Sequence, residues 1–509
     1  MADHSYQFDL LVIGSGPAGQ KAAISAAKRG AQVGLVERDP MAGGVCLNTG
    51  TVPSKSLREA VLYLTGYRQR GYYGSGYRLK EKIKSGDLIL RTNHVIQLER
   101  DVINEDIEAN NVARIVGTAR ITGPHEATVQ YGGMESSYTA ANLLVCVGTK
   151  PRRPADVPFD CFNVIDSDGL YMNGNELVPL PDSMIVLGAG VIGIEYACMF
   201  AALDIPVTLI DPRPNPLSFV DEDIARILYD SMETAGVELV FGTSYTKIEV
   251  AGETDGPEAR VRVATESGRL YEADMLLFAL GRVPATDDLG LAEAGVELDK
   301  RGYVKVDSHF RSSVPSIYAA GDVIGFPSLA STSAEQGRIA ALHVMGDSRE
   351  WQVELLPYGI YTIPEISMVG KTEEQLKKEG IGYFTGTALW RDTARGKIVG
   401  DLSGALKLLF RTDDQKLAGV HIIGEGATEL VHIGQAVMAF GGGPDYFIRS
   451  VFNYPTLAEA YKKAAQNAMN RMAGRAHHTA PLSQQVLHGD LHENLTRLSG
   501  EVRLPADLL

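Results

Sequence analysis

Residues 9–19 read Asp-Leu-Leu-Val-Ile-Gly-Ser-Gly-Pro-Ala-Gly, and residues 184–193 read Met-Ile-Val-Leu-Gly-Ala-Gly-Val-Ile-Gly. In both stretches an apolar run, typical of a buried parallel strand, leads directly into the pattern Gly-x-Gly-x-x-Gly. A helix is predicted after each turn, over 18–28 in the first copy and over about 192–202 in the second. The sequence therefore predicts an α/β fold with two Rossmann-like dinucleotide-binding units.

A carboxylate follows each glycine turn at the same distance. Glu37 lies 23 residues after Gly14, and Asp211 lies 23 residues after Gly188. In such units the first glycine permits a tight turn, the second lets the backbone approach a pyrophosphate, and the third lets the helix pack on the strand. The helix N-terminus then faces the phosphates, and the acid accepts hydrogen bonds from a ribose. The glycines concerned are Gly14, Gly16 and Gly19 in the first copy and Gly188, Gly190 and Gly193 in the second.

The alternative is that these glycines serve only as tight turns. A lone pattern of this kind is a weak signal, but here strand, turn, helix, strand and acid follow one another in the same order twice. Two dinucleotides in one chain predict an electron-transferring enzyme with one resident cofactor and one nucleotide that exchanges.

The composition is that of a soluble protein with several domains. The chain has 509 residues, too many for one hydrophobic core, so roughly two to four domains are expected. Its net charge of −15 argues against nucleic acid as the main partner. No apolar run is long enough to cross a bilayer, no signal peptide is visible, and the four cysteines show no pairing pattern. We therefore expect a cytoplasmic protein that does not associate with membranes.

The segment between the two copies, residues 43–57, reads Gly-Gly-Val-Cys-Leu-Asn-Thr-Gly-Thr-Val-Pro-Ser-Lys-Ser-Leu. It resembles the active-site segment of the flavoprotein disulfide reductases, whose pattern is Gly-Gly-x-Cys-x4-Cys-x-Pro-Ser-Lys. The resemblance covers about residues 8–473, because further segments resemble landmarks of that family in the same order. These segments are Cys146-Val-Gly-Thr-Lys-Pro151, Gly281-Arg-Val-Pro284, Tyr318-Ala-Ala-Gly-Asp322 and Tyr361-Thr-Ile-Pro-Glu365.

Two departures distinguish this chain from the disulfide reductases. Thr51 stands where that family has its second cysteine, so Cys46 cannot form the redox disulfide. Tyr454 stands where the family has the histidine that serves the dithiol as acid and base. A thiol relay needs such a base, whereas hydride exchange at a flavin does not. With both changes the chain resembles the soluble pyridine nucleotide transhydrogenases.

The resemblance implies that the first glycine turn binds FAD and that the second binds NAD(H) or NADP(H). It implies that Lys55, Glu195 and Thr51 are catalytic, with Lys55 and Glu195 paired near flavin N5, where a cation stabilises the anionic reduced flavin. The implied FAD-binding residues are Gly14, Gly16, Gly19, Glu37, Arg38, Gly43, Gly44, Val45, Cys46, Thr51, Lys55, Gly117, Thr149 and Asp322. The implied NAD(P)-binding residues are Gly188, Gly190, Gly193, Glu195, Asp211, Arg213 and Gly281.

Several of these residues also have a purely structural interpretation. Lys55 could be a solvated helix lysine, and Glu195 an ordinary acid on a helix surface. Asp211 by itself predicts NAD, because a carboxylate repels the 2′-phosphate of NADP, whereas Arg213 could supply the cation that NADP needs. Both together are compatible with both nucleotides, or Arg213 lies on the surface of a turn. Cys46 is either a packed remnant or a reactive thiol.

The order of the motifs predicts the domain limits. We expect an FAD-binding domain over 1–155 and 281–350, an NAD(P)-binding domain over 156–280, and a C-terminal α+β dimerisation domain over 351–474 that forms a homodimer or a higher homo-oligomer. The tail over 475–509 extends beyond the resemblance. Its four histidines have no cysteine nearby, and we expect no metal site.

The function that these observations predict is reversible hydride transfer between NADPH and NAD+ through bound FAD, by a ping-pong mechanism. Two rivals stay open. One is an NAD(P)H:acceptor reductase that uses a quinone, a dye-like acceptor or oxygen. The other is a catalytically silent FAD-binding subunit. Tyr454 either reaches the flavin of a partner subunit or only fills the interface.

Overall fold

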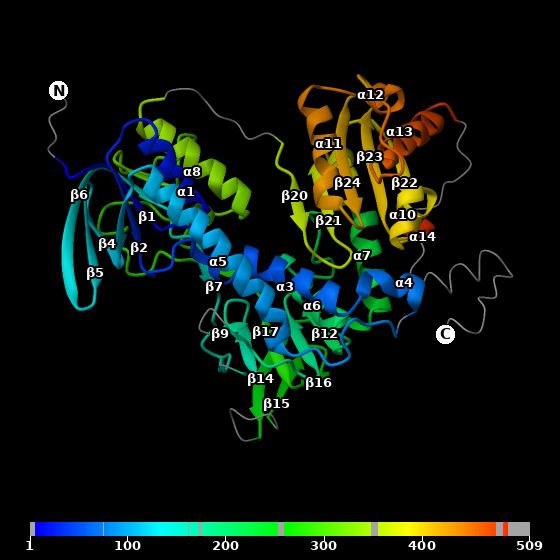
Figure 1. Ribbon diagram of the computed structural model, residues 1–509, viewed down its shortest axis with the longest axis horizontal. Helices are drawn as coiled ribbons and strands as arrows, with labels where there is room; N and C mark the ends of the chain where they lie inside the picture. The colour runs from blue at the N-terminus through cyan, green and yellow to red at the C-terminus, as the bar shows by residue number, and fades with distance from the viewer. Residues whose placement is uncertain are drawn as a thin grey trace.

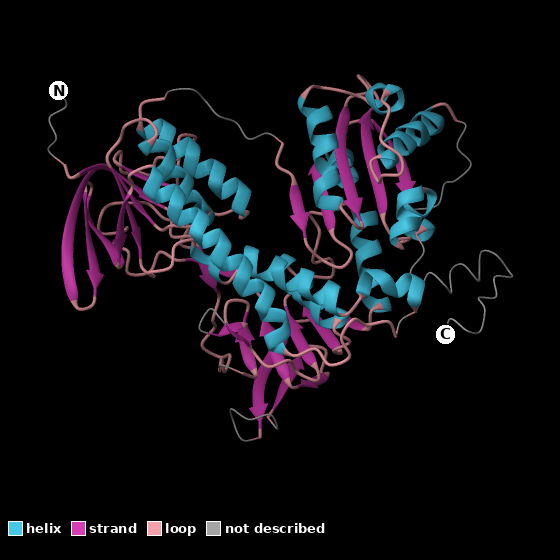
Figure 2. Ribbon diagram, viewed as in Figure 1, coloured by secondary structure: helices cyan, strands magenta, loops and turns pink. Residues whose placement is uncertain are grey.

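Three units, each built on a sheet, make up the chain in the computed structural model, which describes residues 6–74, 76–160, 162–172, 176–252, 259–347, 355–474 and 482–486. In Figure 1 the first unit, around β1 (Phe8–Ile13), lies at the upper left, the unit around β17 (Met275–Phe278) lies at the bottom, and the unit around β24 (Leu417–Ile423) lies at the upper right. Figure 2 shows helices packed on the sheets. The long helices α3 (Thr51–Leu64) and α5 (Ser85–Ala109) run across the centre of the molecule.

The first sheet is built around the first glycine turn. Its central strands β1 (Phe8–Ile13) and β2 (Val33–Glu37) are parallel, and their buried residues are apolar except Glu37 at the end of β2. The strand β6 (Met134–Val145) continues the parallel sheet beside β1 with its C-terminal half and pairs antiparallel with β5 through its N-terminal half. The other strands are β3 (Ala113–Val116), β4 (Thr118–Gly123), β5 (Glu126–Tyr131) and β19 (Ile317–Ala319). Because β19 returns from far along the chain to pair with β6, the second unit is inserted into the first.

Helix α1 (Pro17–Ala27) starts at the first glycine turn and packs against α8 (Ala330–Val344). Apart from Ile24, its buried residues are alanines and a glycine, which let the two helices approach closely. A Cβ on Gly337 of α8 would collide with the carbonyl oxygen of Ala18. This close packing fixes where the N-terminus of α1 points.

The second sheet is parallel and is built around the second glycine turn. Its strands, in spatial order, are β13 (Val237–Phe241), β12 (Val207–Asp211), β11 (Met184–Leu187), β17 (Met275–Phe278) and β8 (Val164–Asp166). The flanking elements are α6 (Val191–Ala202), α7 (Glu222–Thr234) and an antiparallel sheet of β14 (Tyr245–Ala251), β15 (Arg260–Thr265) and β16 (Leu270–Ala273). The antiparallel pair β7 (Thr149–Pro151) and β18 (Arg282–Pro284) lies where the chain enters and leaves this unit.

The third unit is an antiparallel sheet covered by helices. Its strands, in spatial order, are β20 (Tyr358–Ile360), β21 (Ile366–Gly370), β24 (Leu417–Ile423), β23 (Ala405–Arg411) and β22 (Tyr383–Leu389). Its main helices are α11 (Ala427–Ala439) and α13 (Glu459–Met472). The short helix α14 (Leu482–Gln485) packs against α7 of the second unit, and Leu482 is buried there.

The observed architecture confirms the predicted fold class, with two parallel α/β units and a third α+β unit. The helices predicted over 18–28 and about 192–202 are found at Pro17–Ala27 and Val191–Ala202. The domain limits at 155, 281 and 350 stay predictions, and most of the tail over 475–509 lies outside the described residues.

Candidate active site

The two glycine turns open on one cavity with a volume of about 790 Å³. Its size is within the range of small-molecule and cofactor sites. The predicted binding residues on its wall are Gly14, Gly16, Glu37, Arg38, Gly44, Val45, Cys46, Thr51, Lys55, Gly117, Thr149, Gly188, Gly190, Glu195, Asp211, Arg213, Gly281 and Asp322. The structure therefore brings the residues of both predicted sites to one continuous space.

Three predicted binding glycines do not lie on the cavity wall. A Cβ at Gly19 would collide with the carbonyl oxygen of Gly14, and one at Gly193 with that of Gly188. These two glycines therefore let a helix pack on its turn. Gly43 has φ +116°, and a Cβ there would meet the Leu47 side chain at 2.6 Å.

The first glycine turn is held by a hydrogen-bond network around Ser15. The Ser15 N–H and hydroxyl both donate to Glu37 Oε2, at 2.9 and 2.6 Å, and the Ser15 oxygen accepts from the Gly43 N–H at 3.0 Å. Gly16, the residue before helix α1, has no side chain to cap the helix, so the first N–H groups of α1 are left for another partner. Ser15 was not predicted, although it lies inside the glycine pattern.

At the second turn, Asp211 is fully buried and both of its carboxylate oxygens accept hydrogen bonds. Oδ2 accepts from the Ala189 N–H and from Arg213 Nη2, both at 2.7 Å, and Oδ1 accepts from the Arg213 N–H and Nε, both at 2.8 Å. Burial alone would raise the pKa of Asp211, but the hydrogen bonds from Arg213 and Ala189 outweigh it and lower that pKa. Arg213 is thus paired with the acid, and its side chain is half exposed.

These features fit two dinucleotides. Helices α1 and α6 are each preceded by a glycine, which offers no side-chain cap, and the positive ends of their dipoles lie at the cavity. A Cβ at Gly16 or at Gly190 would have no protein atom within 4 Å, so the backbone leaves room there for a pyrophosphate. One carboxylate, Glu37 or Asp211, lies beside each turn.

Between the two turns, Lys55 of α3 and Glu195 of α6 form an ion pair. Lys55 Nζ lies 2.7 Å from Glu195 Oε2, and the other carboxylate oxygen, Oε1, accepts from the Tyr361 N–H at 2.8 Å. Glu195 is 3% exposed, and 27% of the Lys55 side chain is exposed. The structure therefore places Lys55 and Glu195 together on the cavity wall, and neither is an isolated surface group.

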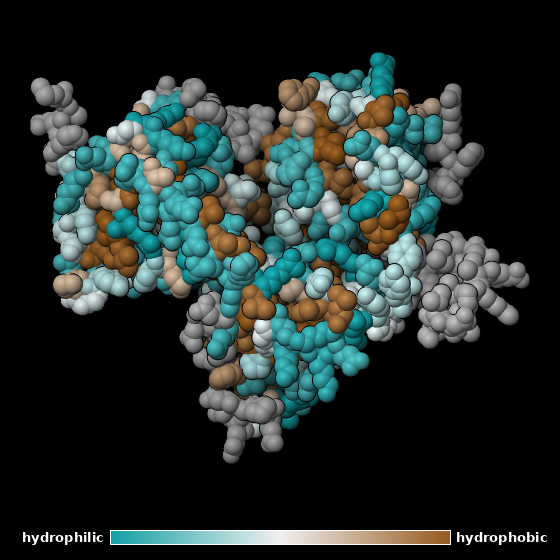
Figure 3. Space-filling view, in the orientation of Figure 1, coloured by the Kyte–Doolittle hydropathy of each residue, from teal (hydrophilic) through white to brown (hydrophobic). Residues whose placement is uncertain are grey.

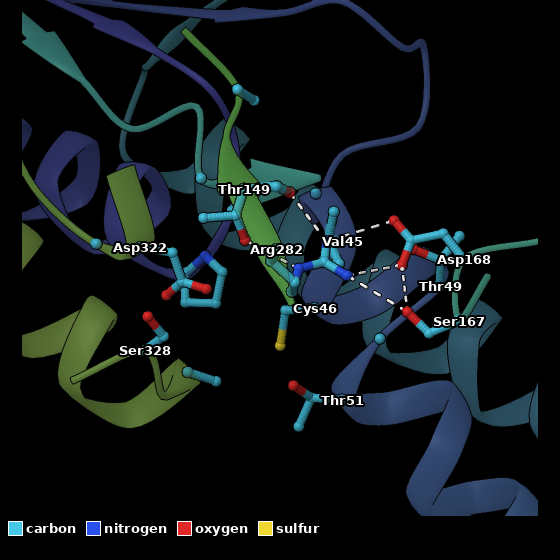
Figure 4. Close-up of a pocket in the computed structure, with 18 of the residues that line it drawn as sticks. Val45, Cys46, Thr49, Thr51, Thr149, Ser167, Asp168, Arg282, Asp322 and Ser328 are labelled. Carbon is cyan, nitrogen blue, oxygen red and sulfur yellow. Dashed lines mark hydrogen bonds and ion pairs between the residues drawn. The ribbon is translucent and has the colours of Figure 1, made fainter. Parts of the chain in front are cut away.

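Cys46 and Thr51 stand at the two positions that correspond to the cysteines of the disulfide-reductase pattern. Figure 4 shows the Cys46 sulfur pointing towards Thr51. Burial raises the pKa of the Cys46 thiol above its usual value, and a hydrogen bond with Thr51 only partly offsets this. The thiol is therefore protonated at neutral pH, which makes it a poor nucleophile.

Cys46 is expected to react with iodoacetamide more slowly than free glutathione at pH 7.5, because its raised pKa lowers the thiolate fraction. Mass spectrometry of the native protein measures the rate of Cys46 modification. The same measurement on denatured protein gives the rate for a fully accessible Cys46 thiol. The rate should still rise above pH 9, since a raised pKa moves the titration to higher pH. Modification of Cys46 as fast as that of glutathione would contradict this assignment.

A second polar cluster on the cavity wall, around Arg282, was not predicted. Arg282 Nε and Nη2 donate to the Thr149 hydroxyl and carbonyl oxygens at 3.0 and 2.9 Å, and Nη1 donates to Asp168 Oδ1 at 3.0 Å (Figure 4). Ser167 and Asp168 come from the loop after β8. The Gly281-Arg-Val-Pro motif could have drawn attention to Arg282. The hydrogen-bond partners of Arg282, however, lie more than 110 residues away in sequence, so the cluster could not be predicted.

The third unit exposes large apolar side chains. Phe440, Val451 and Tyr454 are 92%, 95% and 74% exposed. Figure 3 shows apolar surface over α11 of the same unit. An exposed apolar patch such as the one over α11 is typical of a protein–protein interface.

Within the described parts of the chain, no helix is both long and apolar enough to cross a bilayer. The same residues contain no group of three or more His, Cys, Asp or Glu side chains arranged to hold a metal ion. The tail histidines of the sequence lie outside the described residues.

Comparisons with known proteins show the family of the chain. The family model described as pyridine nucleotide-disulphide oxidoreductase matches residues 8–337, and the model of its dimerisation domain matches residues 356–465. The chain is 49% identical over 468 residues to a soluble pyridine nucleotide transhydrogenase of Mycobacterium bovis, covering 92% of this chain and 98% of that one. It is 40% identical over 474 residues to one of Escherichia coli, covering 92% and 99%.

Two solved structures share the fold. LpdA of Mycobacterium tuberculosis superposes with a TM-score of 0.81 at 27% identity, covering 90% of this chain and 99% of that one. The HOCl-induced flavoprotein disulfide reductase RclA of Escherichia coli superposes with a TM-score of 0.78 at 26% identity, with the same coverage. The chain therefore belongs to the pyridine nucleotide-disulphide oxidoreductases and, within them, to the soluble pyridine nucleotide transhydrogenases.

Proposed function

We propose that this chain is an FAD-dependent NAD(P)+ transhydrogenase that moves a hydride reversibly between NADPH and NAD+. The observation that carries the proposal is the cavity itself, on which two dinucleotide-binding turns and the Lys55–Glu195 ion pair meet. Thr51 in place of a second thiol removes the dithiol chemistry of the disulfide reductases, and hydride exchange needs no dithiol.

The residues of the first turn would hold FAD. Gly16 and the N-terminus of α1 would bind its pyrophosphate, Glu37 would accept from its adenosine ribose, and Asp322 would face its ribityl chain. When bound, the flavin supplies the chemistry, since it can accept a hydride from one nicotinamide and pass it to another.

The second turn would bind both nicotinamide nucleotides in succession, which makes the mechanism ping-pong. Gly190 and the N-terminus of α6 would bind the pyrophosphate of either nucleotide. Lys55 places a cation on the cavity wall, where it favours negative charge that develops during the reaction. Glu195 fixes the position of that cation.

The Asp211–Arg213 pair would let one site accept both nucleotides. With NAD(H), the Asp211 carboxylate would accept from the ribose hydroxyls, and with NADP(H), Arg213 would turn from Asp211 to the 2′-phosphate. The half-exposed Arg213 side chain has room for this exchange.

Asp211→Ala is expected to raise KM for NAD(H) by about tenfold and KM for NADP(H) by less, because only the ribose of NAD(H) loses its acceptor. Arg213→Ala is expected to do the opposite, since it removes the cation and leaves the Asp211 charge facing the 2′-phosphate. Steady-state kinetics with both nucleotides measure the two ratios. An equal change of both KM values in each variant would overturn the roles of the pair.

We propose that the working form is a homodimer or a higher homo-oligomer. The dimerisation-domain match and the exposed Phe440, Val451 and Tyr454 support this assembly. Light scattering of the purified protein gives the mass directly, and a monomer at micromolar concentration would contradict the proposal.

The deciding experiment is anaerobic. The purified yellow protein is reduced with NADPH, NAD+ is then added, and flavin absorbance and NADH are followed together. Reoxidation of the flavin with stoichiometric NADH supports transhydrogenation. Reduction without reoxidation by NAD+ would point to another acceptor, such as a quinone, and no reduction at all would point to a catalytically silent flavoprotein.

A further inference from the structure

Tyr361 contacts both members of the Lys55–Glu195 ion pair. It directly follows β20, at the entry to the third unit, and lies on the cavity wall. Its backbone N–H donates to Glu195 Oε1 at 2.8 Å, and Lys55 Nζ lies 4.9 Å from the centre of its ring. A single residue of the third unit therefore meets an ion pair whose partners come from the first and second units.

The two contacts restrict the ion pair in different ways. Glu195 gives one oxygen to Lys55 and the other to the Tyr361 N–H, so rotation of this buried carboxylate would break one of the two bonds. The Lys55 ammonium lies close both to the carboxylate and to the ring of Tyr361, whose electron-rich face attracts a cation. The ring thus limits where a flexible lysine side chain can place its charge.

Tyr361 is itself held on both sides. Burial raises the pKa of the Tyr361 phenol, and the neighbouring Thr428 of α11 only partly offsets this, so the phenol is neutral at physiological pH. The next residue, Thr362, accepts from Arg58 Nε at 3.0 Å. Arg58 lies one turn after Lys55 on α3 and is almost fully buried. The segment around Tyr361 therefore lies beside α11 of the third unit and is tied to the helix that carries the catalytic lysine.

We infer that Tyr361 is a positioning residue that sets the place of the Lys55 cation and so couples the third unit to the electrostatics of the active-site cavity. Only the effect of Tyr361 on turnover rests on the proposed function. The effect of Tyr361 on the reduction potential of a bound flavin is expected whichever compound accepts the electrons.

The test replaces the Tyr361 side chain and keeps its backbone N–H. Tyr361→Leu removes the ring, whereas Tyr361→Phe keeps the ring and loses only the hydroxyl group. In the flavin-loaded protein, reduction is expected to become about tenfold less favourable in Tyr361→Leu, a shift of about 30 mV to more negative potential for a two-electron couple. Tyr361→Phe should stay close to the wild type, with an unchanged KM in both variants.

Equilibration with a reference dye gives the potential without any nicotinamide nucleotide, so failure of NAD+ to reoxidise the protein would not affect this result. The double variant Lys55→Met/Tyr361→Leu should show no shift beyond Lys55→Met alone, because Tyr361 acts through the lysine. An unchanged potential in Tyr361→Leu, or equal shifts in the Phe and Leu variants, would overturn the inference. If Tyr361→Leu does not retain flavin, Tyr361→Met provides the same comparison.

Discussion

Lys55→Met is expected to lower the rate constant for reduction of the bound flavin by NADPH by on the order of 100-fold. The Lys55 ammonium is the cation of the ion pair on the cavity wall, 2.7 Å from Glu195, and methionine keeps the length of the side chain but removes the charge. Removing a preorganised charge from a partly desolvated site affects the transition state more than substrate binding, so KM should change little. Anaerobic stopped-flow absorbance measures the rate constant directly.

The matched control is Lys55→Arg, which keeps a cation beside Glu195 and should retain a larger part of the rate. Lys55→Met also leaves the buried Glu195 carboxylate without its ion-pair partner. The melting temperature and the flavin content should therefore be recorded, so that loss of fold is separated from loss of rate. A Lys55→Met rate within threefold of wild type would remove Lys55 from the catalytic residues.

Gly190→Ala is expected to raise KM for both NADH and NADPH by at least about tenfold, with the fold and the flavin content intact. Gly190 has φ −73°, which alanine adopts without strain, and its Cβ would have no protein atom within 4 Å. The added methyl group would stand only in the space that the pyrophosphate of a nucleotide would enter. Steady-state kinetics with each nucleotide measure the two KM values, and a thermal melt shows whether the fold is intact.

Two glycine variants serve as controls for Gly190→Ala. Gly193→Ala should destabilise the protein itself, because its Cβ would collide with the Gly188 carbonyl oxygen. Gly16→Ala, the equivalent change in the first turn, should lower flavin retention and leave the protein folded, since its Cβ also has no protein neighbour. Unchanged KM values in Gly190→Ala would show that no nucleotide backbone passes this turn.

Much of this protein could be predicted from short stretches of sequence. The two strand–glycine–helix units were found where the pattern placed them, because their backbone requirements are local. Gly14 and Gly188 have φ of +104° and +106°, and their Cβ positions lie against neighbouring carbonyl groups, so few other residues fit there. Thr51 is equally local, since one residue type decides whether a disulfide can exist. The glycine pattern also predicted different roles for its second and third glycines. In the structure Gly16 lines the cavity, whereas Gly19 lets the helix pack against the Gly14 carbonyl.

Only the tertiary structure decided how distant residues meet at the site. Lys55 and Glu195 are 140 residues apart, Glu195 and Tyr361 are 166 apart, and Arg282 lies 114 residues from Asp168. No local pattern encodes these contacts, because they depend on how the three units pack around α3. The orientation of Arg213 could not be predicted either, although it lies two residues from Asp211. Its side chain could pair with the acid or point to solvent, and the structure shows the pair. The sequence by itself thus determined the two nucleotide-binding units and the loss of the thiol relay, and the packing of the three units determined the charge on the cavity wall.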